Sequence, residues 1–132
     1  MRRPHENLKA WQLSVGLVTK LYKATEPFPE TERFGLTAQI RRAGVSIAAN
    51  LAEGAARGSD ADYLRFVRIS RGSLSELETL LLIASNLRFI DKEVYAELLN
   101  EGEAIGRLVE GLMRRLREGT VSDEGASYAL ED

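Results

Sequence analysis

The sequence predicts an all-α fold, an antiparallel four-helix bundle whose helices run up, down, up and down. Four stretches repeat apolar residues at spacings of three and four, turn signals separate these stretches, and the links between them are short. Short links between long helices place consecutive helices side by side and antiparallel. We expect the bundle to span residues 6–118 and a flexible acidic tail to follow at 119–132.

Each expected helix is bounded by residues that start or stop helices. Pro27 and Pro29 separate the first two helices, and Gly58 ends the second. Ser59 and Asp91 are suited to cap the third and fourth helices, because their side-chain oxygens can accept a hydrogen bond from a free backbone N–H. The expected helices span about residues 6–25, 30 or 31 to 57, 60–89 and 92–118.

The first helix carries two apolar stripes, whereas a core-facing helix of a monomer needs one. Residues expected in the core form the first stripe: Leu8, Trp11, Val15, Val18 and Tyr22. Beside it lie Leu13, Leu17 and Leu21. Together the stripes cover roughly 220° of the helix, where about 100° is enough. We therefore expect Leu13, Leu17 and Leu21 to form an oligomer interface; the alternative is that these leucines are simply exposed.

Ser46, Asn50 and Glu53 lie four and three residues apart on one face of the second helix, among small residues. Buried polar groups must find hydrogen-bond partners, and such a network can fix how two helices align. We interpret the three residues as a structural polar network. The alternative is a site for a ligand or a partner.

Charge is unevenly distributed along a chain whose net charge is −2. Residues 39–71 contain six arginines and three acids, whereas residues 73–103 contain seven acids and two bases. The basic stretch raises the possibility of a polyanionic partner, RNA or DNA. The acidic stretch and a pI near 5.6 argue against it.

Four arginines in the basic stretch have no acid three or four positions away on their own helix: Arg41, Arg42, Arg68 and Arg71. The planar guanidinium presents N–H donors that match the geometry of a phosphate. We therefore hypothesise that these four arginines bind nucleic acid. In the alternative, antiparallel pairing about the turn at Gly58 places Arg41 and Arg42 level with Glu76, which would bind them in interhelical ion pairs.

The sequence predicts no enzyme, no cofactor and no metal site. Cysteine is absent, and the single histidine, His5, lies outside the expected bundle, so neither a di-iron site nor a histidine-activated nucleophile can be built. Glu76 and Glu78 lie two apart on a helix and point to different faces. No apolar run approaches the roughly 20 residues that span a membrane, so we expect a cytoplasmic protein without membrane contact.

The segment 34–54, FGLTAQIRRAGVSIAANLAEG, resembles the signature of the 23S rRNA-intervening-sequence family of four-helix-bundle proteins. Other motifs agree: Trp11 and Gln12, Phe28 and Pro29, Gly58 and Ser59, and GSLSELE at 72–78. The resemblance implies an up-down bundle that assembles as a cyclic homopentamer, without an established activity. The similar accessory variability proteins of diversity-generating retroelements are associated with nucleic acid and a reverse transcriptase, which would be a partner only within that subgroup.

These observations lead to one expectation of function and one alternative. We expect a non-enzymatic, self-associating scaffold or adaptor, with RNA or DNA as the leading candidate ligand. The alternative is a protein–protein interaction module that binds no nucleic acid.

Overall fold

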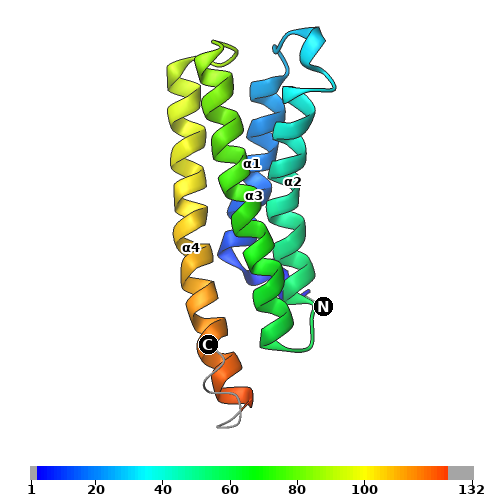
Figure 1. Cartoon of the computed structure of the whole chain (residues 1–132), viewed down its shortest axis with the longest axis vertical. Helices are drawn as coiled ribbons and strands as arrows, with labels where there is room; N and C mark the ends of the chain where they lie inside the picture. The colour runs from blue at the N-terminus through cyan, green and yellow to red at the C-terminus, as the bar shows by residue number, and fades with distance from the viewer. Residues whose placement is uncertain (1–2, 125–132) are drawn as a thin grey trace.

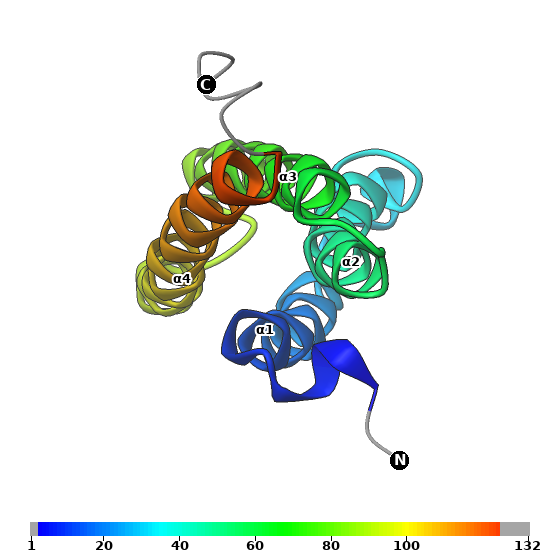
Figure 2. The same cartoon turned by 90° about the horizontal axis from the view of Figure 1, so that it is seen from below.

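The structure is a computed structural model that describes residues 3–124, with side chains described as far as Gly119. It contains four α-helices: α1 (Lys9–Thr25), α2 (Leu36–Ala55), α3 (Asp60–Asn86) and α4 (Lys92–Glu124). A short 3-10 turn precedes each of the first two helices, η1 (Pro4–Asn7) before α1 and η2 (Glu30–Glu32) before α2. The helices run alternately up and down (Figure 1), and in the end view α3 lies between α2 and α4 (Figure 2). The predicted all-α bundle is confirmed.

Side-chain caps fix two helix starts where the sequence predicts them. The backbone N–H of Asp62 donates to Ser59 Oγ at 3.2 Å, and that of Val94 donates to Asp91 Oδ1 at 2.9 Å. The second helix begins later than predicted, at Leu36, because η2 takes up Glu30 to Glu32. Glu32 Oε1 then accepts from the backbone N–H of Leu36 at 3.0 Å, which satisfies one free donor at the helix start.

The fourth helix does not end at Gly119, as the sequence predicts, but continues to Glu124. Gly119 does not adopt the left-handed conformation, and a glycine stops a helix chiefly when it does. The first residues of the expected flexible tail at 119–132 are therefore helical. Residues 125–132 lie outside the part of the chain that the structure describes.

The burial of the two apolar stripes of α1 differs from the prediction, which placed the stripe of Leu8, Trp11, Val15, Val18 and Tyr22 in the core; of these, Leu8 and Trp11 are partly buried against it. Leu17 and Leu21, expected at an oligomer interface, are 1% and 0% exposed in the chain's own core, and Leu13 packs partly buried against it. Val15 and Tyr22, expected in the core, are 42% and 44% exposed. The assignment to a partner is therefore wrong for Leu17 and Leu21, while Leu13 is only partly covered by the core. Val15 and Tyr22 are the residues of the other stripe that are left exposed.

Two hydroxyl residues are buried together with the leucines on the inward face of α1. Ser14 and Thr25 lie on the same face and are 1% and 2% exposed. Their hydroxyls donate to the carbonyl oxygens of Ala10 and Leu21, at 2.7 and 2.8 Å. A hydroxyl satisfied within its own helix can be buried, so these two polar residues do not prevent the leucine face from lying in the core.

Small residues let α2 approach α3 closely at Gly54. A Cβ there would lie 2.9 Å from Phe66 Cβ and 3.2 Å from the backbone oxygen of Tyr63. These atoms belong to the backbone or are attached directly to it, so they cannot move without the helix. The two helices can therefore keep this distance only with glycine at position 54.

We expect Gly54→Ala to lower the free energy of unfolding, because overpacking of this kind costs about 1–3 kcal/mol and outweighs the ~1 kcal/mol that alanine gains in a helix. Gly72→Ala in α3 is the matched control, since a Cβ at Gly72 meets nothing within 4 Å. It should instead raise stability by up to about 1 kcal/mol. Urea unfolding measures both, and equal effects of the two changes would contradict the close approach.

Candidate interaction surfaces

The four arginines of the phosphate hypothesis do not form one surface. Arg41 faces α1: its Nε donates to Thr25 Oγ1 at 2.9 Å, an Nη donates to the carbonyl oxygen of Tyr22 at 3.2 Å, and its guanidinium carbon lies 4.3 Å from the centre of the Tyr22 ring. Arg71 faces α4 and pairs with Glu110 at 3.3 Å. Two of the four arginines are therefore held on different sides of the bundle.

Arg42 and Arg68 are exposed, and no ion pair among the described residues includes either of them. The alternative that Glu76 binds Arg41 and Arg42 is likewise not seen in the described part of the chain. Arg42 is adjacent in sequence to Arg41, whereas Arg68 belongs to α3. Only the α2 pair remains close enough to act together.

Ser46 and Asn50 join a polar cluster between α2 and α3, and Glu53 does not. The Asn50 amide donates to the carbonyl oxygen of Ser46 at 2.9 Å and to Ser46 Oγ at 3.1 Å. Ser46 Oγ is 2.7 Å from Ser73 Oγ on α3. Glu53 instead pairs at 2.9 Å with Arg57, which lies two residues past the end of α2.

A second hydroxyl, on Ser70, crosses the same seam. Ser70 is 0% exposed and donates to the carbonyl oxygen of Ile47 at 2.9 Å. Sequence reasoning did not single out Ser70 or Ser73 as partners, although antiparallel pairing about Gly58 places them level with α2. The cluster fixes how far α2 and α3 can slide along each other.

We expect Asn50→Leu to lower the free energy of unfolding by about 1 kcal/mol, because Ser46 loses its Asn50 partner at a half-buried position. The matched control is Gln39→Leu, the same kind of change at an exposed position of α2. Thermal unfolding by circular dichroism compares the two. An unchanged midpoint for Asn50→Leu would show that the cluster does not stabilise the fold.

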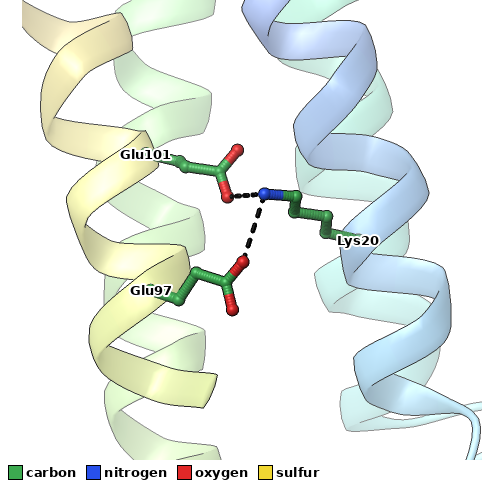
Figure 3. A network of polar contacts seen from close by, with 3 residues as sticks. All are labelled: Lys20, Glu97 and Glu101. Atoms are coloured by element: carbon green, nitrogen blue, oxygen red, sulfur yellow. Dashed lines mark hydrogen bonds and ion pairs between the residues drawn. The ribbon is translucent and has the colours of Figure 1, made fainter. Parts of the chain in front are cut away.

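A lysine and two glutamates connect α1 to α4 (Figure 3). Lys20 Nζ lies 2.6 Å from Glu101 Oε2 and 3.1 Å from Glu97 Oε2. The hydrogen bonds to Glu101 and then Glu97 raise the pKa of the Lys20 ammonium group. Their contribution to stability is therefore present at neutral pH and is lost only as the pH rises through that raised pKa.

An uncharged hollow, which we name the apolar groove, runs between α1 and α2 on the outside of the bundle. It has a volume of about 300 Å³ and is lined by Trp11, Val15, Val18, Thr19, Val45, Ala48 and Ala49. Three of these, Trp11, Val15 and Val18, belong to the stripe that the sequence analysis placed in the core. No charged side chain among the described residues lines it.

A second hollow, which we name the arginine groove, adjoins the apolar groove at Val45. It has a volume of about 480 Å³ and is lined by Tyr22, Arg33, Phe34, Thr37, Ala38, Arg41, Arg42 and Val45. Three arginines and two aromatic rings thus border it, and no carboxylate of the described residues does. Phe34 is 86% exposed, a property that helical periodicity could not reveal because Phe34 precedes the helix.

A third groove, between α3 and α4, differs in its charge. Its lining contains bases and acids in equal number: Arg71, Arg107, Arg114, Glu78, Glu103 and Glu110. Such a surface does not select for the sign of a partner's charge. The arginine groove is therefore the more selective surface for an anion.

Within the described residues, no three histidine or acidic side chains are grouped so that they could hold a metal ion. None of the helices in the described part of the chain is long and apolar enough to cross a membrane.

These features define a class, a small four-helix-bundle protein with an apolar and a basic groove side by side on its α1–α2 face. The family model for the 23S rRNA-intervening sequence protein matches residues 6–111, and the chain belongs to that family. A solved structure of a Bacteroides thetaiotaomicron protein of unknown function, from the S23 ribosomal protein family, is similar with a TM-score of 0.71 and 25% identity, over 79% of this chain and 97% of that one. No curated protein matches the sequence.

Proposed function

We propose that this protein is a non-enzymatic scaffold that self-associates by covering the apolar groove with a second copy of the chain. The observation that carries the proposal is the groove itself, an uncharged hollow formed by two helices. Val15 and Val45 border it from opposite helices and are 42% and 43% exposed. An uncharged hollow bordered by exposed valines is the surface that a second copy could cover at the least cost in desolvated charge.

A second copy suits the groove because the chain also exposes aliphatic side chains on another element. Four aliphatic side chains of α3 and its C-terminal end are between 41% and 54% exposed: Ile69, Leu82, Ile83 and Leu87. A closed ring uses two different surfaces of each subunit, one meeting the other on the neighbour. Ile83 and Leu87, one helical turn apart, would supply the second surface in the cyclic homopentamer that the family resemblance implies.

The chain should therefore have a mass well above 14.7 kDa at micromolar concentration. We expect Val15→Glu and Ala49→Glu to reduce this mass, because each places a charge in a surface that would lose its contact with water on assembly, and burying an unpaired charge is unfavourable. Both residues are exposed, so the fold should survive. Native mass spectrometry measures the mass, and Asn100→Glu on the exposed face of α4 is the charge-matched control. A monomeric wild type would refute self-association.

We further propose that the scaffold binds RNA or DNA, and the arginine groove is the observation in favour. Arg41 and Arg42 remain from the four residues of the sequence hypothesis, and Arg33 joins them. Arg68 and Arg71 are left out, because both belong to α3 and Arg71 pairs with Glu110 on the α4 side. The alternative, a module that binds only protein, predicts no binding of either nucleic acid at low salt.

A further inference from the structure

We infer that the arginine groove holds a single-stranded nucleic acid, with one base stacked on Phe34 and the adjacent phosphates on Arg41 and Arg42. This inference rests on the proposed nucleic-acid binding and specifies its form. It differs from phosphate contact alone because it requires an aromatic platform as well as positive charge.

Phe34 is presented as such a platform. It lies between η2 and α2, is 86% exposed, and therefore adds little to the core. The guanidinium carbon of Arg33 is 5.2 Å from the centre of the Phe34 ring, so this group covers one side of the ring. The other face is left for a base, and stacking of this kind tolerates any base because each has a π-face.

Arg41 is held in place for an anion before any ligand arrives. Its Nε and one Nη donor are bonded to Thr25 and Tyr22, and its guanidinium stacks on the Tyr22 ring. A guanidinium carries five N–H donors, so about three of them remain for a phosphate. A side chain already fixed in position loses less conformational freedom on binding than a mobile one.

The charge around the groove favours a polyanion. Arg33, Arg41 and Arg42 line it, and the nearest acids of η2 have other roles. Glu30 lies 3.6 Å from Arg33 and offsets part of its charge, whereas Glu32 caps α2 through the N–H of Leu36. Arg41 and Arg42 therefore carry the charge that would attract the anion. An acidic peptide would satisfy the arginines but would leave the open face of Phe34 without a stacking partner.

The geometry favours a single strand over a duplex. Arg42 lies six residues into α2, so it is about 9 Å along the helix axis from the helix start that follows Phe34. A strand can therefore reach the ring and the guanidinium together. Duplex bases are stacked on each other and paired, which leaves no free base face for Phe34, whereas unstacked single strands offer one.

The test measures fluorescence anisotropy of labelled eight-nucleotide oligouridine and oligodeoxythymidine, and of a blunt-ended duplex of eight G·C base pairs without a loop, over a series of salt concentrations. Phe34→Ala should weaken single-strand binding about tenfold at every salt concentration, and Phe34→Trp should restore it. Arg42→Gln should weaken binding and flatten the slope of log K against log salt by about 0.7, the change expected when the protein neutralises one phosphate fewer on a single strand. Arg68→Gln, outside the groove, is the matched control.

The outcomes separate this inference from the function on which it rests. Absence of wild-type binding at low salt would overturn both. Binding that is unaffected by Phe34→Ala, or as strong for the duplex as for the single strands, would overturn the stacked single strand and leave nucleic-acid binding standing. An Arg68→Gln effect equal to that of Arg42→Gln, or equal competition by polyglutamate, would show that the groove is not the site. Native mass spectrometry of each variant shows independently whether self-association is intact.

Discussion

The close approach of α2 and α3 is the constraint on which the rest of the structure depends. At Gly54 the two backbones are too near for any side chain, and further along the seam Ser70 donates to the carbonyl oxygen of Ile47. These two contacts fix both the distance and the alignment of the helices. The α2–α3 hairpin is thus the frame against which α1 and α4 pack.

That frame determines which face of α1 is left uncovered. Gly44 of α2 receives Leu21, whose Cδ1 would lie only 2.5 Å from a Cβ at that position, and Leu17 is buried on the same side. With its leucines directed inward, α1 leaves Val15 and Tyr22 on the outside, next to Val45 of α2. Both grooves follow from this rotation, and the function that we propose follows from the grooves.

The fold could be predicted from the sequence because its signals are local. The caps at Ser59 and Asp91 and the helical spacing each depend on residues a few positions apart. The two grooves were harder to predict than the helices, since they depend on which of the two apolar stripes of α1 is buried. Ser14 and Thr25 made the core face of α1 look polar in the sequence pattern. The pattern counts every hydroxyl as polar, including one that is hydrogen-bonded within its own helix and buried.

Ion-pair partners on neighbouring helices could not be predicted from the sequence either. The absence of an acid near Arg71 on its own helix suggested a free cation, but Glu110 of α4 supplies the charge. Exposure of Phe34 likewise depends on the path of the link between α1 and α2, which no periodic pattern describes. The residues of the candidate sites were therefore regrouped by the structure, although the helices that carry them were correctly placed.

The most direct test of the account is whether the apolar groove is covered in solution. The chain has no cysteine, so a single Ala49→Cys substitution places one thiol in the groove and Gly72→Cys places one on the exposed face of α3. The rate of maleimide modification is measured for both at micromolar and at nanomolar concentration. The account predicts that the thiol at position 49 reacts slowly in the concentrated sample and faster on dilution, while the thiol at position 72 reacts fast in both. Equal, fast reaction at the two positions at every concentration would contradict it.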